Sequence, residues 1–169
     1  MTDPTAPPTP EDGEARAVAA LTAMRLRFTL TRHGAVRSLA EAAEARGMAP
    51  KQIVKTLVVR RGEGDFVFVL VPGGRTISWP KLRAVLDVSR LSMPDADVAF
   101  EVTGYRRGTI TPFGSTTAWP VVADARVPGQ QVSIGAGAPG VAATLDGTAM
   151  VLRLAATVAD VTDEEPAAT

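Results

Sequence analysis

The residue whose position most suggests chemistry is a lysine inside an otherwise apolar run. The run IVKTLVVR covers residues 53–60, and Lys55 would share one face of a strand with Leu57 and Val59. Lysine is costly to bury and rarely interrupts an apolar face. Lys55 could therefore point into a pocket, where its ammonium group would bind a phosphate or polarise a carbonyl group. It could equally lie on an edge strand and reach water through its flexible stem.

A second candidate is the glycine-rich segment TGYRRGTITPFG at residues 103–114. It contains three glycines, one proline and four hydroxyl-bearing side chains. Glycines allow backbone N–H groups to approach a ligand closely and to point at an anion. The segment therefore favours a backbone anion site, and an ordinary surface loop after a helix is the alternative.

A third segment, GAGAPG at residues 135–140, has the spacing G-x-G-x-x-G. This pattern binds dinucleotides when it joins a strand to a helix and an acidic residue follows about 20 residues later. Here Pro139 interrupts the pattern, and the strand-like VAATL follows it. We expect this segment to be a loop that lines a pocket or a plain turn. The hypothesis of a nucleotide-dependent oxidoreductase has no support beyond this glycine spacing.

The residue content excludes several classes of catalytic site. The chain has no cysteine and only one histidine, which removes thiolate nucleophiles and zinc sites built from several such ligands. A carboxylate-only Mg²⁺ site remains open, but we expect no cofactor. Ser115 and Ser133 lack evident partners for a catalytic triad. The single histidine, His33, is a candidate general base or ligand contact, or else an ordinary residue at the end of a strand.

The net charge is zero, but the basic residues are concentrated in one part of the chain. Residues 14–61 contain ten basic and three acidic side chains, a local net charge of +7. Such an excess can attract a phosphate backbone, and a solvated arginine-rich surface is the alternative. No stretch is apolar and long enough to span a bilayer, and no secretory signal is evident. We therefore expect a cytoplasmic protein with no membrane partner.

Periodicity and capping residues predict helices and strands that alternate along the chain. Predicted helices cover residues 14–25, from Ser38 to Gly47, 80–87, from Ser92 or Pro94 to Gly104, and from Asp146 to Leu154. Predicted strands cover residues 26–30, 53–60, 66–72, 88–91, 117–124, 131–135 and 141–145, of which 53–60 and 66–72 form a hairpin, and residues 157–161 close the domain. This order favours an α+β fold with a mixed, partly antiparallel central sheet and flanking helices. We expect one domain at 14–162 between a disordered tail at 1–13 and an acidic tail at 163–169.

In combination, these segments are more specific than each is alone. The sequence KTLVV at 55–59, VPG at 71–73, TGYRRG at 103–108 and TPFG at 111–114 resembles the YbaK/ProX family of aminoacyl-tRNA deacylases. The resemblance runs from about His33 to Val161. It implies a mixed-sheet α+β fold with a pocket that accepts the aminoacylated 3′ end of tRNA.

The resemblance also assigns residues to this pocket. It implies catalytic roles for Lys55, Gly108 and Thr109, in which the lysine anchors a phosphate or carbonyl and backbone N–H groups hold the ester. It implies substrate binding by Thr56, Gly104, Tyr105, Arg106, Thr111, Pro112, Gly114, Gly135 and Gly137, and His33 is kept as a candidate substrate contact because of its residue type. No metal ligands are assigned. The family often has glycine then serine where this chain has Thr109 and Thr111, so the edited amino acid stays open.

The function that this resemblance implies is deacylation of a mischarged tRNA by an enzyme acting in trans, without a metal or a covalent intermediate. Its partners would be the tRNA acceptor end and an aminoacyl-tRNA synthetase, and alanyl- or cysteinyl-tRNA(Pro) are candidate substrates. The alternative is a non-catalytic module with the same pocket, which binds a tRNA end or an aminoacyl ligand and partners a synthetase. The absence of a strong general base favours this alternative.

Overall fold

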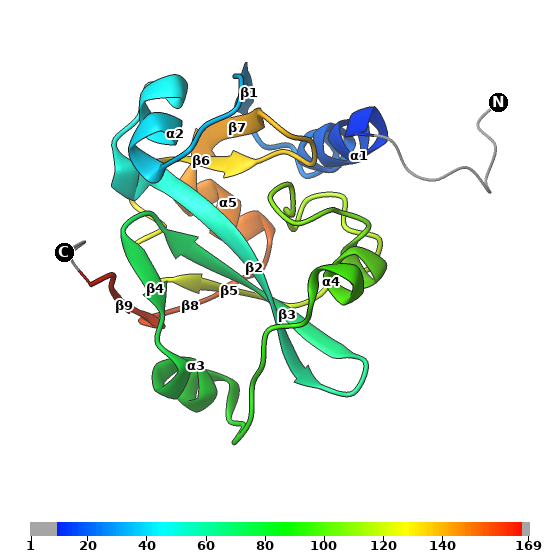
Figure 1. Cartoon of the computed structure of the whole chain (residues 1–169), viewed down its shortest axis with the longest axis vertical. Helices are drawn as coiled ribbons and strands as arrows, with labels where there is room; N and C mark the ends of the chain where they lie inside the picture. The colour runs from blue at the N-terminus through cyan, green and yellow to red at the C-terminus, as the bar shows by residue number, and fades with distance from the viewer. Residues whose placement is uncertain (1–9, 167–169) are drawn as a thin grey trace, which may run out of the picture.

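The computed structural model describes residues 10–166 of the chain (Figure 1). Its helices are α1 (Pro10–Ala23), α2 (Leu39–Arg46), α3 (Trp79–Leu86), α4 (Ala96–Thr103) and α5 (Gly147–Arg153), with a 3₁₀ turn, η1, at Pro50–Gln52. Its strands are β1 (Phe28–Arg32), β2 (Ile53–Gly62), β3 (Asp65–Pro72), β4 (Arg75–Ile77), β5 (Val121–Asp124), β6 (Gln131–Gly135), β7 (Val141–Asp146), β8 (Thr157–Ala159) and β9 (Thr162–Glu164). None of the described helices is long and apolar enough to cross a membrane.

Seven strands form one mixed sheet, and its centre is the hairpin that the sequence predicts. The order across the sheet is β1-β7-β6-β2-β3-β5-β8, and β4 pairs separately with β9. β2 and β3 are antiparallel, whereas β6 joins β2 and β5 joins β3 in parallel. Together with the five helices, this mixed and partly antiparallel sheet confirms the predicted α+β class (Figure 1).

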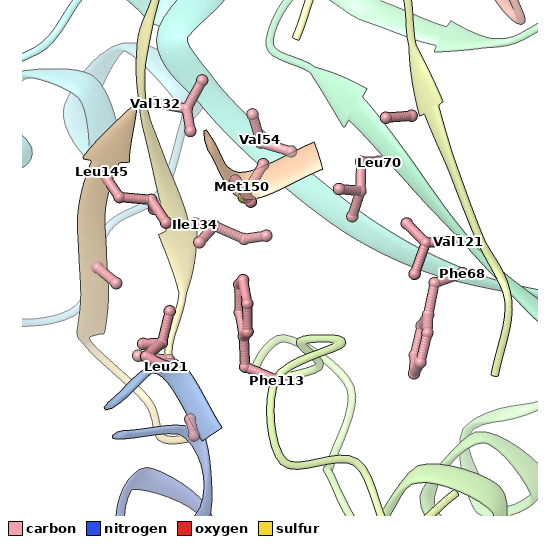
Figure 2. Close-up of a cluster of buried hydrophobic side chains, with 14 of the residues drawn as sticks. Leu21, Val54, Phe68, Leu70, Phe113, Val121, Val132, Ile134, Leu145 and Met150 are labelled. Carbon is pink, nitrogen blue, oxygen red and sulfur yellow. The ribbon is translucent and has the colours of Figure 1, made fainter. Parts of the chain in front are cut away.

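Hydrophobic residues cover both faces of the sheet, and alternation along β2 decides which core each side chain joins. Val54 and Val58 belong to a larger core that also contains residues of α1, α5 and the loop after α4. Leu57 and Val59 belong to a smaller core on the side of α3. Figure 2 shows part of the larger core, where Phe113 from the loop points toward the side chains of β6. Since β3 contributes to both cores, its sequence is almost entirely apolar.

Helix ends follow the capping residues of the sequence closely. Four helices begin after a side chain that accepts a hydrogen bond from the backbone N–H three residues later. These N-caps are Ser38, Ser78, Asp95 and Asp146. Gly47 and Gly104 end α2 and α4 in the left-handed conformation, as predicted. The predicted start of α4 at Ser92 or Pro94 is a few residues too early, because Asp95 supplies the cap.

The predicted strand at residues 88–91 is wrong. Beside it, an isolated antiparallel bridge joins Ser92 to Arg60 of β2, and no strand forms there. The chain then leaves the edge of β2 toward α4, so a ladder does not extend beyond this bridge. The strand predicted at 117–124 is also too long: β5 begins at Val121, directly after Pro120, which lacks the N–H group that a ladder needs.

The ends of the domain differ from the predicted limits. α1 begins at Pro10, inside the segment predicted as a disordered tail. β9 includes residues 163 and 164, which were assigned to the acidic tail, and pairs them with β4. Residues 1–9 and 167–169 lie outside the described residues, so their predicted disorder stays a prediction.

Asp124, the last residue of β5, fixes the C-terminal segment against the sheet. Its buried carboxylate accepts hydrogen bonds from the hydroxyl of Thr162 (2.8 Å) and from the N–H of Val161 (3.1 Å). The backbone N–H and the guanidinium of Arg126 also donate to it, each at 3.1 Å. Burial opposes ionisation of this carboxyl group, but the hydrogen bonds outweigh burial and lower its pKa. The C-terminal strand is therefore held by a buried charge.

Candidate functional site

A cleft of about 240 Å³ lies where β2, the loop after α4 and the end of β6 meet. Segments far apart in the sequence form its wall, which consists of Arg46, Ile53, Val54, Lys55, Thr56, Leu57, Val58, Met93, Pro94, Ala99, Arg107, Gly108, Ile110 and Gly135. Four residues that the sequence assigns to a site thus line one cavity. They are Lys55, Thr56, Gly108 and Gly135.

β2 presents an open strand edge to this cleft. Its parallel pairing with β6 ends at Val54, and its next contact along that edge is the bridge from Arg60 to Ser92. Backbone groups alternate in direction along a paired strand. Thr56 and Val58 therefore direct their N–H and C=O groups to the same edge as Val54 and Arg60, where no strand pairs with them. These groups can hydrogen-bond an extended ligand.

The hydroxyl of Thr56 is a further unpaired group at this position. Its oxygen is buried and has no hydrogen-bond partner among the described residues. Leaving a buried hydroxyl unpaired costs roughly 1–3 kcal/mol. Such groups are rare in folded proteins, and this one belongs to a residue that lines the cleft, where a ligand could supply the missing partner.

The side chain of Lys55 is half exposed and forms an ion pair with the C-terminal segment. Its amine lies 3.5 Å from a carboxylate oxygen of Glu165, which is also half exposed. Glu165 is held there because its N–H donates to the carbonyl of Gly74. An exposed ion pair contributes only about 0–1 kcal/mol, so an anionic ligand could displace this carboxylate from the lysine.

The glycine-rich loop is held from behind by α1. Arg16 donates hydrogen bonds to the carbonyl groups of Gly104 (2.7 Å) and Gly114 (3.2 Å), close to the two ends of the loop. The same guanidinium lies over the ring of Tyr105, 4.6 Å from its centroid. Phe113 anchors the loop in the larger core (Figure 2). Because both ends are fixed, the tip of the loop is held against the cleft.

Eight residues of the predicted binding set are not part of the wall of the cleft. They are His33, Gly104, Tyr105, Arg106, Thr111, Pro112, Gly114 and Gly137. The hydroxyl of Tyr105 donates to the carbonyl of Phe113 at 2.6 Å, and Thr111 is fully buried. Gly137 packs so closely on α1 that an added Cβ would lie 2.4 Å from the carbonyl oxygen of Gly13. These contacts shape the loop, and direct binding of a substrate by these residues stays a prediction.

The turn at the tip of the loop uses the backbone N–H of Thr109 and leaves that of Gly108 available. Thr109 donates both its N–H (2.9 Å) and its hydroxyl (2.8 Å) to the carbonyl of Arg106. The guanidinium of Arg106 lies over the ring of Phe100, 4.8 Å from its centroid. Gly108 is exposed, lines the cleft and has a φ of 92°, a conformation that favours glycine. Its N–H has no partner among the described residues, so Gly108 is the stronger candidate for holding an anion.

Sequence reasoning missed part of the wall, namely Arg46, Met93, Pro94, Arg107 and Ile110. In the sequence, Arg46 is an ordinary basic residue at the end of a predicted helix. Arg107 lies between Arg106 and Gly108, which were both predicted as site residues. His33 lies next to the cleft without lining it: its Nε2 accepts a weak hydrogen bond of 3.4 Å from Arg46. No local pattern distinguishes these residues, because their proximity arises only in the folded chain.

The described chain gives no structural basis for two alternatives, dinucleotide binding by the segment GAGAPG and a carboxylate-only Mg²⁺ site. GAGAPG joins β6 to the antiparallel β7, so no helix follows it as dinucleotide binding requires. Among residues 10–166 there is no cluster of three or more side chains suited to hold a metal ion.

A family model described as the aminoacyl-tRNA editing domain matches residues 33–151. The chain belongs to the aminoacyl-tRNA editing domain family. This finding confirms the resemblance to YbaK/ProX proteins. The matched range contains the whole wall of the cleft, so the cleft is part of the editing domain.

The editing domain is similar to segments of proline–tRNA ligases. The ligase of Trichlorobacter lovleyi is 35% identical over 88 residues, which are 52% of this chain and 15% of the ligase. The ligase of Thermosipho africanus is 36% identical over 80 residues, which are 47% of this chain and 14% of the ligase. The similarity thus covers only a small part of each ligase.

Solved structures show the same fold over nearly their whole length. One is a candidate trans-editing enzyme for prolyl-tRNA synthetase, with a TM-score of 0.80 and 26% identity over 91% of this chain and 98% of that one. Another is the hypothetical protein APE2540, with a TM-score of 0.80 and 25% identity over 88% of this chain and 99% of that one. These proteins share the fold of the editing domain.

Proposed function

We propose that this chain is a trans-acting aminoacyl-tRNA deacylase that hydrolyses the ester bond of a mischarged tRNA. The observation that carries the proposal is the convergence of Lys55, Thr56 and Gly108 on one cleft of an editing domain. The candidate trans-editing enzyme of the same fold and the related segments of proline–tRNA ligases support it. Alanyl- and cysteinyl-tRNA(Pro) are the substrates to test first.

The proposed reaction needs neither a metal nor a covalent enzyme intermediate. A water molecule attacks the carbonyl carbon of the ester, the bond to the ribose oxygen breaks, and that oxygen takes up a proton. The N–H of Gly108 and the ammonium group of Lys55 would stabilise the negative charge that develops on the carbonyl oxygen. The hydroxyl of Thr56 would bind the substrate, and a ribose hydroxyl or a backbone carbonyl would orient the water. Since an aminoacyl ester is already activated, positioning of this kind can suffice.

A second groove supports an RNA backbone as the partner. It has a volume of about 700 Å³ and is lined by Arg60, Arg61, Gly62, Arg83 and the segment 89–92. Arg61 pairs with Asp65, but Arg83 and Arg90 form no ion pair within the described part of the chain. The chain continues from this groove through Met93 and Pro94, which line the cleft. An RNA whose end enters the cleft could therefore bind the arginine groove through its phosphates.

We also propose an aminoacyl-tRNA synthetase as a second partner and the cytoplasm as the place of action. The related segments of proline–tRNA ligases support this proposal, because there a segment similar to this domain belongs to the same chain as a synthetase. A synthetase could add affinity for tRNA that a single small domain lacks.

The deciding experiment is a deacylation panel with several mischarged tRNAs. We expect multiple turnover on at least one of them and a loss of about 100-fold or more in kcat/KM for Lys55→Ala. Lys51→Ala is the matched control, because it removes a nearby lysine that does not line the cleft, and it should retain activity. Saturable binding without product across the panel would reject the hydrolase and favour the non-catalytic binding module.

A further inference from the structure

Arg46 forms one wall of the cleft and has no assigned role. It is the last residue of α2, where Gly47 ends the helix, and its guanidinium extends toward β6. Nη1 donates to the hydroxyl of Ser133 at 3.3 Å, and Nε donates to Nε2 of His33 at 3.4 Å. Both contacts are long and neither partner is a carboxylate, so several donors of the guanidinium remain available to a ligand.

The positive charge of Arg46 is not compensated by the protein. No carboxylate in the described residues lies within ion-pair distance of it, although the side chain is partly buried. Removal from water lowers the pKa of the guanidinium, in keeping with its lack of an anionic partner. Burying a cation without a counter-ion costs free energy, and this cost is recovered when an anion binds.

We propose that Arg46 binds the phosphate group on the 5′ side of the terminal nucleotide when an RNA end occupies the cleft. This inference rests on the proposed function. In an aminoacylated RNA end, the amino group of the ester is cationic and only the phosphates are anionic. A cleft whose wall carries Arg46, Lys55 and Arg107 would repel the amino group and attract a phosphate. The planar fork of an arginine suits a phosphate better than the point charge of a lysine does.

His33 acts in this arrangement as a positioning residue for Arg46. Nδ1 of His33 lies 2.8 Å from the carbonyl of Gly34, and a proton on this nitrogen would be donated to that carbonyl. In that tautomer, Nε2 accepts the hydrogen bond from Nε of Arg46. This contact orients the guanidinium toward the cleft.

The experiment compares the binding of adenosine and adenosine 5′-monophosphate to the full chain by calorimetry or NMR titration. We expect the wild-type protein to bind the monophosphate about tenfold or more tightly than adenosine. Arg46→Gln should remove this difference without weakening the binding of adenosine, and Arg46→Lys should retain part of it. Arg37→Gln is the matched control, because Arg37 is exposed and does not line the cleft, and it should change neither affinity.

Two results would overturn the proposal. One is a wild-type protein without preference for the phosphate, including a protein that binds neither compound. The other is an Arg46→Gln protein that binds both compounds more weakly by the same factor, although its unfolding midpoint shows that it is folded. The assay involves no turnover, so its outcome is separate from that of the deacylation panel: a phosphate-dependent site can persist in a protein that hydrolyses nothing, and an active deacylase can lack one.

Discussion

The unpaired hydroxyl of Thr56 gives a prediction in which stability and function change in opposite directions. Valine has nearly the same shape as threonine and replaces the hydroxyl by a methyl group. An unpaired buried hydroxyl costs roughly 1–3 kcal/mol, and no hydrogen bond within the described protein is lost when it is removed. We expect Thr56→Val to raise the free energy of unfolding by about 1 kcal/mol and Tm by roughly 2–4 °C.

The same substitution should impair the proposed reaction. If the hydroxyl bonds the substrate, its loss removes one neutral hydrogen bond, which contributes about 0.5–1.5 kcal/mol. This corresponds to a fall in kcat/KM of roughly 3- to 10-fold. Thr56→Ser keeps the hydroxyl and should keep most of the activity.

Ser115 offers a matched control for this test. Its hydroxyl is also buried without a partner among the described residues, but it does not line the cleft. Ser115→Ala should therefore stabilise the protein to a similar extent and leave deacylation unchanged. The assays are urea denaturation and deacylation of the substrate found in the panel. A Thr56→Val protein that is less stable by 1 kcal/mol or more, or one that is stabilised and fully active, would refute the reasoning.

Three further predictions concern the elements around the cleft. Phe113 and Phe68 lie in the same core, and Phe113→Leu and Phe68→Leu should each lower the free energy of unfolding by about 1–1.5 kcal/mol. Only Phe113→Leu should speed amide hydrogen exchange at the tip of the glycine-rich loop. Equal exchange in both variants would contradict the anchoring role of Phe113. Asp124→Asn should lower the free energy of unfolding at pH 7 by about 1–3 kcal/mol. Because the pKa of Asp124 is depressed in the native state, the stabilising effect of its carboxylate in the wild type should be lost as pH falls below about 4. Urea midpoints that vary with pH equally in the wild type and the variant would contradict this prediction. Glu165→Gln should lower KM for the tRNA substrate by about two- to fivefold, because Lys55 loses a competing carboxylate; an unchanged KM means that Glu165 does not compete.

The sequence predicts those parts of the fold that depend on local signals. The capping side chains and the glycine at the end of α2 mark their helix ends correctly, since these signals act within four residues. The strand predicted at 131–135 coincides with β6, and the central hairpin is found with ends shifted by two residues or fewer. The predicted strand at 88–91 fails because a strand needs a neighbour, and β2 offers only one bridge to this segment.

The candidate site is only half visible in the sequence for the same reason. Lys55 is recognisable by residue type, because a lysine in an apolar strand is unusual, whereas Gly108 is indicated only as part of a glycine-rich segment that matches the family. Arg46 is not, since its importance depends on the approach of α2 to β6 and on the lack of a carboxylate nearby. The role of Thr109 as a backbone donor also could not be judged from the sequence, because the turn to Arg106 already uses its N–H.

The location of the unsatisfied groups argues that the cleft is a binding site and not an accident of packing. Elsewhere in the described chain, helix N-termini are capped and the buried carboxylate of Asp124 accepts several hydrogen bonds, although the buried hydroxyl of Ser115 lacks a partner. Around the cleft, a hydroxyl, a strand edge, a loop N–H and a guanidinium all lack strong partners. Their convergence on one volume of about 240 Å³ means that a single ligand, with an anionic group and several hydrogen-bonding groups, could satisfy them together.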